Sequence, residues 1–169
     1  MDADQLRARQ APLKKLFRES PDLAQRVLVA SGVLDPGSPR CEVQSFLGST
    51  PAGLHTYTGG DGSEACSAEM LLEALVGCAG VTLSVVAKAM DIPLEKAVVR
   101  AEGSLDFRGT LGVDRSVPVG FEKIQLVFEL ATSASDEQLS KLIELTERYC
   151  VVHQSLHGTG PSKLKRITA

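Results

Sequence analysis

The strongest constraint on the fold is an apolar stretch from Ala74 to Ala87, bounded on both sides by charged residues. Nearly every residue in it is apolar or small, so a helix formed there has no polar face to turn to water. Ser67 is the predicted cap and the segment 91–93 ends in proline, so we expect one helix from about Ala68 to Met90. The apolar stretch is shorter than the roughly 18 residues of a membrane span. The sequence therefore predicts a buried central helix.

Two strand patterns and a second helix follow. From Val99 to Arg108 and from Lys123 to Leu130, apolar and polar residues alternate, as in strands with one face in water. The connection between them holds three glycines and one proline, so we expect an antiparallel pair. Ser135 with Gln138 three residues later forms a capping box, which predicts a helix that continues through Cys150.

A weaker pattern precedes the central helix. Cys41 to Leu47 predicts a strand, Gly48 to Gly53 a turn and Leu54 to Thr58 a returning strand. A last strand is expected over Leu164 to Thr168. The order of these elements indicates an α+β fold, with antiparallel sheets and helices on one side of them.

The N-terminal part differs from the rest in composition. It is rich in charge, and we expect helices over Leu6 to Phe17 and Pro21 to Val29, followed by a linker at Asp35 to Pro39. We therefore divide the chain into a helical extension with its linker, residues 1–38, and a compact domain, residues 39–169.

Composition excludes several classes of function. The net charge is −3, no run of lysine and arginine is present, and aromatic residues make up only 4% of the chain, which argues against a nucleic-acid partner. The first residues are acidic and do not resemble an apolar leader, so we expect a cytoplasmic protein without membrane contact. At 169 residues, the chain is long enough for one well-packed core.

Four cysteines remain as the candidates for chemistry. In a cytoplasmic chain of this size they are expected to be thiols. Cys78 and Cys150 each fall within a predicted apolar helix, where a cysteine is usually a small packing residue. If the two helices pack together, however, these thiols can meet and act as a redox pair. Cys41 is expected to pack in its strand, and Cys66, beside the helix cap, is a minor redox candidate.

Other site chemistries have weaker support. The three histidines lack the spacing of metal ligands, so we predict neither a metal nor a cofactor. His153 lies three residues after Cys150 and suggests a hydrolase dyad, but no third residue stands ready to orient the imidazole.

Two segments carry a family resemblance. The segment Glu69 to Leu83, with sequence EMLLEALVGCAGVTL, and the segment Tyr149 to Leu156, with sequence YCVVHQSL, resemble the two cysteine helices of the OsmC/Ohr family (osmotically inducible protein C and organic hydroperoxide resistance protein). The resemblance covers roughly Cys41 to Ala169. It implies an intertwined homodimer of α+β subunits with active sites at the subunit interface.

The resemblance also implies a reaction. Cys78 corresponds to the peroxidatic cysteine, Cys150 to the resolving cysteine, and Glu69 to an upstream carboxylate of the site. An organic hydroperoxide would be reduced to its alcohol through a Cys78 sulfenic acid and a Cys78–Cys150 disulfide. An external dithiol, such as a lipoyl protein, would then regenerate the thiols.

The sequence departs from the family pattern in two places. The activating arginine of the family has no clear counterpart; Arg40 of the partner chain is our first candidate, ahead of Arg18 and Arg26, with Glu69 holding the cation. Val151 follows the second cysteine where the hydroperoxide-resistance branch typically has proline. The alternative hypothesis is therefore a non-catalytic dimer that binds a small apolar or electrophilic ligand.

Overall fold

The computed structural model describes residues 2–45, 47–156, 162–166 and 168 of the chain. The predicted last strand therefore extends partly outside the described residues, and His157 lies outside them. The helices and strands, in chain order, are α1 (Ala3–Glu19), η1 (Pro21–Ala24), β1 (Ser31–Leu34), β2 (Cys41–Ser45), β3 (Gly48–Gly53), η2 (Thr56–Thr58), β4 (Ala65–Cys66), α2 (Ser67–Ala89), β5 (Lys96–Ser104), α3 (Phe107–Thr110), β6 (Lys123–Ala131), α4 (Asp136–Tyr149), α5 (Val151–Ser155) and β7 (Lys163–Arg166).

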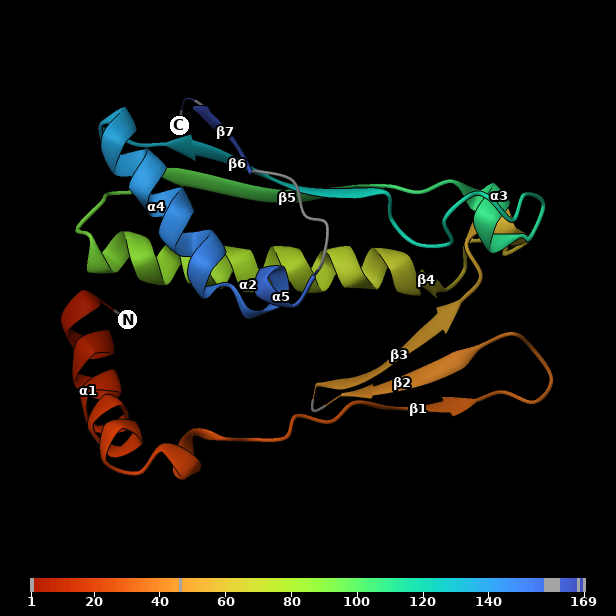
Figure 1. The fold of residues 1–169 in the computed structure, drawn as a ribbon, viewed down its shortest axis with the longest axis horizontal. Helices are drawn as coiled ribbons and strands as arrows, with labels where there is room; N and C mark the ends of the chain where they lie inside the picture. Colours follow the sequence, from red (N-terminus) through yellow and green to blue (C-terminus); the bar gives the residue numbers. More distant parts are fainter. Residues whose placement is uncertain (1, 46, 157–161, 167, 169) are drawn as a thin grey trace.

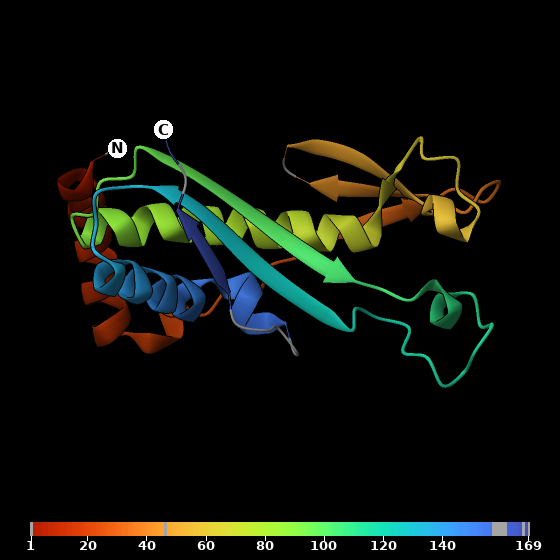
Figure 2. The same ribbon diagram turned by 90° about the horizontal axis from the view of Figure 1, so that it is seen from above.

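The architecture is α+β, as the order of the sequence patterns predicts. One sheet has the strand order β1-β2-β3-β4 and the other has the order β5-β6-β7. The consecutive pairs β1–β2, β2–β3 and β5–β6 are antiparallel, whereas β4 and β7 join their sheets in parallel. Figures 1 and 2 show β5 and β6 running along α2, with α4 and α5 on another side of the same helix.

The core forms where α2, β6 and α4 meet. Leu75 and Leu83 of α2 are buried there, together with Phe128 of β6 and Leu139 and Leu142 of α4. The capping box predicted at Ser135 is present, and it fixes the start of α4. This core holds α4 in place, and with α4 the cysteine at its C-terminal end.

The central helix is buried on one side only within a single subunit. Its buried residues are Leu75, Ala79, Leu83, Val86 and Ala87. Val81, on another face, is 68% exposed, so one subunit alone does not bury this apolar helix all round. By length and composition alone α2 could cross a membrane, a test that core helices of soluble proteins also pass.

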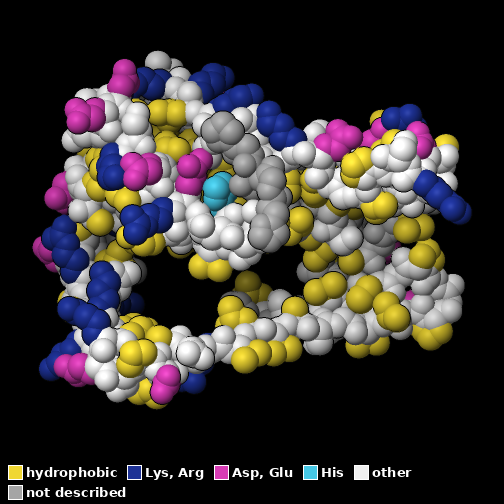
Figure 3. Space-filling model, viewed as in Figure 1, with side chains coloured by type: hydrophobic (Ala, Val, Ile, Leu, Met, Phe, Trp, Pro, Cys, Tyr) yellow, Lys and Arg dark blue, Asp and Glu magenta, His cyan; other side chains and the backbone are white. Residues whose placement is uncertain are grey.

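The N-terminal third forms an arm that leaves the body of the subunit. The segment between η1 and β1 is extended and contains the apolar run Val27 to Ala30, in which Leu28 is 91% exposed. Figure 3 shows an open space between this arm and the body, with hydrophobic atoms at its edges. The second N-terminal helix ends at Ala24 instead of Val29. An apolar segment this exposed is not stabilised by its own subunit.

The hairpin in this arm differs from the predicted one. Gly48–Gly53 is strand β3 rather than a turn, and Thr56–Thr58 is a short 3-10 helix rather than a strand. The chain reverses earlier, because Ser45 pairs with Gly48, whose φ of +127° favours glycine. The expected linker at residues 35–39 is the turn that joins β1 to β2. The division at residue 38 stays a prediction, although β1, from the predicted extension, pairs with β2 of the predicted domain.

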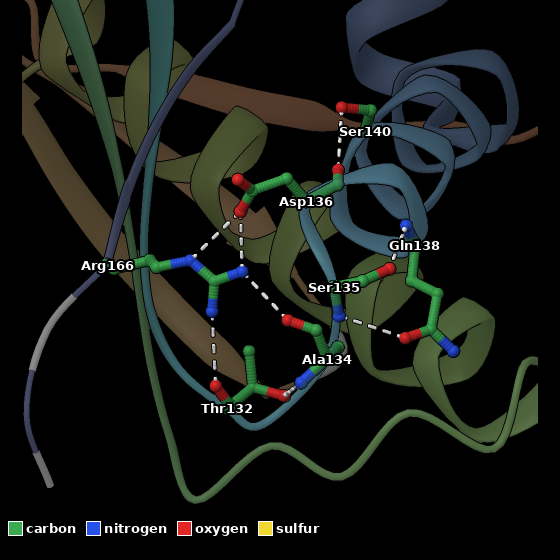
Figure 4. A network of polar contacts seen from close by, with 7 residues as sticks. All are labelled: Thr132, Ala134, Ser135, Asp136, Gln138, Ser140 and Arg166. Carbon is green, nitrogen blue, oxygen red and sulfur yellow. Dashed lines mark hydrogen bonds and ion pairs between the residues drawn. The ribbon is translucent and has the colours of Figure 1, made fainter.

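An arginine fastens the C-terminal strand β7 to the start of α4 (Figure 4). The Arg166 guanidinium donates to Asp136 Oδ1 at 2.7 and 3.2 Å, and to the carbonyl oxygens of Thr132 and Ala134 at 3.2 and 2.8 Å. Its planar fork makes four hydrogen bonds to these three residues, one more than the three N–H groups of an ammonium could make.

We expect Arg166→Ala to lower the free energy of unfolding by about 1–2 kcal/mol, because several charge-assisted hydrogen bonds in a partly exposed place are lost. Arg166→Lys should recover only part of this loss. Urea denaturation measures both variants, with Arg115→Ala as the control at an exposed arginine outside this network. Equal stabilities for Arg166→Ala and Arg115→Ala would show that the network contributes nothing.

Candidate functional site

The thiols of Cys78 and Cys150 lie in contact. Cys78 is half-buried in the middle of α2, and Cys150 is completely buried in the core between α4 and α5. The two thiols hydrogen bond to each other, so the structure brings together the two cysteines that the sequence places 72 residues apart. Both are reduced.

Cys150 lies at a break between two helices and not inside one, contrary to the prediction. Its backbone is extended, with φ −76° and ψ 107°, and it ends α4 and begins α5. Its N–H still donates to the Thr146 carbonyl at 2.9 Å, and its carbonyl accepts from Gln154 N–H at 2.9 Å. The break turns the first amides of α5, those of Val151 and Val152, toward the sulfur of Cys78.

These contacts move the pKa values of the two thiols in opposite directions. Burial raises the pKa of Cys78, but hydrogen bonds from the Val152 N–H, the Cys150 thiol and the Val151 N–H more than offset it, so the pKa lies below the usual value. For Cys150, burial and the negative charge on Cys78 raise the pKa, despite a hydrogen bond from the His153 N–H. When one of the pair is ionised, it is therefore Cys78.

The site thus has a nucleophile and a protonated neighbour. A thiolate is the reactive form of cysteine, and backbone amides can stabilise it without a full positive charge nearby. When Cys78 is ionised and Cys150 is protonated, the Cys150 thiol is the donor and the Cys78 sulfur the acceptor. Sequence reasoning missed the amides of Val151 and Val152, because a backbone group leaves no signal in residue identity.

Glu69 does not join this pair within the subunit. It is exposed in the first turn of α2, nine residues before Cys78, which is about 13 Å along a helix axis and on the opposite face. Its predicted role at the site stays a prediction that only a second subunit can fulfil.

The first candidate arginine is held by two carboxylates that the sequence did not single out. Arg40 Nη2 lies 3.0 Å from Glu42 Oε2, and Arg40 Nε lies 3.2 Å from Glu64 Oε1. Gly53 makes room for this arrangement, because a Cβ there would overlap the Glu64 carboxylate. Arg40 belongs to the hairpin that Figure 1 shows apart from α5, so one subunit does not bring it to Cys78. Of the other two candidates, Arg18 lies in α1 and Arg26 in the exposed arm.

The other chemistries gain no support from the geometry. His153 Nδ1 is buried and has no hydrogen-bond partner among the described residues, so this nitrogen does not pair with the Cys150 thiol. Within residues 2–45, 47–156, 162–166 and 168, no three His, Cys, Asp or Glu side chains are grouped to hold a metal ion.

The lowered pKa of Cys78 leads to a prediction for Val151. The thiolate fraction rises as pH rises through the pKa, so a lowered pKa should let Cys78 react with iodoacetamide below the free-thiol value of about 8.5. Val151→Pro removes one N–H donor at the first position of α5, where proline fits a helix. We expect its alkylation rate at pH 7 to fall roughly fivefold, because one hydrogen bond worth about 1 kcal/mol is lost.

Val151→Ala is the matched control for this titration, since it removes the same side chain and keeps the N–H. Its alkylation rate should stay within about twofold of the wild-type rate, because the N–H that stabilises the thiolate is kept. If both variants react alike, the amide does not stabilise the thiolate.

Comparisons with known proteins agree with this fold and with the resemblance. The sequence model of the family described as OsmC-like protein matches residues 60–165, and the chain belongs to this family. No curated protein sequence matches the chain.

Solved structures in the family share the fold. An OsmC-like protein from Mycoplasma pneumoniae is 20% identical with a TM-score of 0.64, over 86% of this chain and 97% of that one. An organic hydroperoxide resistance protein from Elizabethkingia anophelis is 16% identical with a TM-score of 0.64, over 86% and 99%. An OsmC-like protein of unknown function from Vibrio cholerae is 14% identical with a TM-score of 0.66, over 85% and 100%. At these identities the likeness concerns the fold.

Proposed function

We propose that this protein is a cytoplasmic thiol peroxidase that reduces organic hydroperoxides to alcohols. One observation carries the proposal. The thiol with the lowered pKa, Cys78, accepts hydrogen bonds from two backbone amides and from the one thiol, Cys150, whose pKa is raised. This is the arrangement that an attacking and a resolving cysteine need. Its family and the name of the Elizabethkingia relative point to the same chemistry.

The first step oxidises Cys78. Its thiolate attacks one oxygen of the O–O bond, that bond breaks, and the leaving alkoxide takes up a proton to become the alcohol. The sulfur gains the hydroxyl and becomes a sulfenic acid. That proton comes from the solvent, and the Cys150 thiol keeps its own proton for the second step.

The second step closes the disulfide and the third reopens it. The Cys150 sulfur attacks the sulfenic sulfur, the S–O bond breaks, and the hydroxyl leaves as water. An external dithiol then attacks one sulfur of the disulfide and becomes oxidised itself, returning both cysteines to thiols. Because Cys150 is completely buried and Cys78 is half-buried, the external dithiol attacks the Cys78 sulfur first.

A second copy of the chain would complete the site. The exposed face of α2 and the exposed apolar arm are both apolar surfaces in contact with water in a single subunit. In a dimer of two intertwined subunits, each subunit would bury these surfaces of the other. In that dimer, Arg40 of the partner subunit is the proposed cation near Cys78. Glu42 and Glu64 would hold it, which reassigns the positioning role that we first gave to Glu69.

The surroundings of Cys78 favour a bulky apolar substrate. Cys78 of α2 and Val152 of α5 are both partly buried hydrophobic residues packed against the core. Such a site gains free energy by burying the apolar part of a hydroperoxide, and hydrogen peroxide has no such part.

The test is turnover with dihydrolipoamide as reductant. We expect the protein to consume cumene hydroperoxide over many turnovers, with kcat/KM at least about tenfold higher than for hydrogen peroxide, since about 1.4 kcal/mol of apolar burial is enough for that ratio. A protein that consumes neither peroxide would favour the alternative hypothesis of a ligand-binding dimer.

A further inference from the structure

A threonine hydroxyl lies beside the reactive thiol. Thr82 follows Cys78 by four residues in α2, so its side chain stands one turn further along on the same face of the helix. Side chains lean toward the start of their helix, which brings the Thr82 hydroxyl over the Cys78 turn. In the apolar stretch from Ala74 to Ala87, Thr82 and Ser84 are the two residues with a hydroxyl. Ser84 accepts a hydrogen bond from the Lys88 ammonium at 3.2 Å, whereas Thr82 contacts Cys78.

The Thr82 hydroxyl makes two contacts with Cys78. Its Oγ1 donates to the Cys78 carbonyl oxygen at 2.8 Å, and it also hydrogen bonds to the Cys78 thiol. Burial raises the pKa of Cys78, and the Thr82 hydroxyl is one of the hydrogen-bonding groups that lower it, together with the amides of α5. A hydroxyl carries a single proton, so it cannot donate fully to both groups at once. Thr82 Oγ1 therefore lies beside two acceptors and has one proton for them.

The contact with the sulfur distinguishes Thr82 from an ordinary threonine in a helix. A hydrogen bond from a threonine hydroxyl to the carbonyl four residues earlier is common and has no chemical role by itself. Thr146 in α4 makes this bond too, to the Leu142 carbonyl oxygen at 2.7 Å, inside the core. Thr82 makes the same bond in a half-buried place, with a reactive sulfur as its second partner.

The hydroxyl proton can pass from one acceptor to the other at little cost. The Cys78 carbonyl also accepts from the Thr82 backbone N–H, the regular bond of an α-helix, so it stays paired when the hydroxyl turns away. The turn moves only the hydrogen, because rotation about the C–O bond leaves Oγ1 in place. A thiolate is the stronger acceptor, since hydrogen bonds to a charged group are about twice as strong as those between neutral groups. Ionisation of Cys78 therefore draws the proton toward the sulfur.

We propose that Thr82 is a catalytic residue of this site, whose hydroxyl turns from the Cys78 carbonyl to the Cys78 sulfur when that sulfur becomes a thiolate. The thiolate is then held from two helices, by the Thr82 hydroxyl of α2 and by the amides of Val151 and Val152 at the start of α5. The role of Thr82 in turnover rests on the proposed function. Its contact with the thiolate does not, because ionisation of Cys78 can be measured without a peroxide.

The pH profile of Cys78 alkylation tests this contact. With iodoacetamide and peptide mass spectrometry, the rate at Cys78 alone is followed as it rises with pH to a plateau, and the midpoint reports ionisation of this thiol. Thr82→Val removes the hydroxyl and keeps the branched shape of the side chain. We expect its midpoint to rise by about one pH unit, because a hydrogen bond to an ion is lost. The rate well below the midpoint should fall about tenfold, and the plateau rate should stay unchanged.

Three further variants control this profile. Thr82→Ser keeps the hydroxyl, so its midpoint should stay within about 0.3 pH unit of the wild type, a twofold change in the ionisation constant. Thr146→Val removes the matching carbonyl bond of α4 and should not shift the midpoint. Thr82→Ala, a second variant without the hydroxyl, should shift it as Thr82→Val does. An unshifted midpoint in either variant without the hydroxyl, or an equal shift in Thr82→Ser, would overturn the proposal.

Turnover of cumene hydroperoxide with dihydrolipoamide gives the second readout. We expect kcat/KM of Thr82→Val to fall about tenfold at a pH below the midpoint and to approach the wild-type value above it, with Thr82→Ser recovering the activity at low pH. An equal fall at every pH would show that Thr82 does not act through the thiolate, and would overturn the proposal. If the wild type consumes no peroxide, the proposed function fails, and the alkylation profile alone decides whether Thr82 holds the thiolate.

Discussion

Replacing Cys78 by serine is expected to lower kcat/KM for cumene hydroperoxide by at least about a thousandfold, equivalent to about 4 kcal/mol of transition-state stabilisation. The serine hydroxyl can accept the same hydrogen bonds from the amides of α5. It does not ionise near neutral pH and is a far weaker nucleophile than a thiolate. The measurement is steady-state consumption of the peroxide with dihydrolipoamide as reductant.

Two further cysteine variants separate the roles at the site. Cys150→Ser should still reduce about one equivalent of peroxide in a rapid first turnover and then stop, leaving Cys78 as a sulfenic acid that a dimedone adduct detects. Cys41→Ser is the matched control, since this half-buried cysteine packs against Gly32 in the hairpin, and its turnover should equal that of the wild type. Full activity in Cys78→Ser would be incompatible with the proposed mechanism.

A charge on the open face of α2 is expected to break the proposed dimer. Val81 is 68% exposed in the single subunit, on a helix whose composition calls for burial all round. In the dimer, Val81→Glu would bury a carboxylate without a partner, which costs several kcal/mol. We therefore expect the dimer Kd to rise at least about a hundredfold, and sedimentation velocity at micromolar concentration to show monomers.

Val113→Glu is the control for this substitution. Val113 is 72% exposed in the connection between β5 and β6, away from the open face of α2, so the same change there should leave the dimer intact. If the wild-type protein sediments only as a monomer, a second copy of the chain does not bury the exposed arm and the open face of α2, and the proposed dimer is wrong.

The sequence predicted the parts of the fold whose patterns are long and regular. The apolar run of α2, the alternation in β5 and β6 and the capping box at Ser135 each correspond to an element in the structure. The returning strand of the hairpin was predicted to begin at Leu54, about six residues after the actual start of β3 at Gly48. Gly48–Gly53 is rich in residues typical of turns, and its strand pairing follows from the tight reversal before Gly48.

The candidate site was predictable only in part, for a physical reason. The two cysteines stand out as residues, and the structure places their thiols in contact. The helix break at Cys150 does not stand out, because Tyr149, Cys150 and Val151 are all compatible with a continuous helix. The break is a tertiary effect: the Cys150 side chain is fixed in the core, and the amides after it then face Cys78. The contacts of Arg40 likewise depend on the fold of the hairpin.

The central claim is that Cys78 and Cys150 form a disulfide when the protein reduces a hydroperoxide. Its most direct test is to treat the reduced protein with one equivalent of cumene hydroperoxide, block free thiols with iodoacetamide, and analyse the peptides by mass spectrometry without reduction. We predict a Cys78–Cys150 disulfide as the main product, with Cys41 and Cys66 alkylated. If Cys78 and Cys150 are both recovered as alkylated thiols after the peroxide is added, the proposed function is wrong.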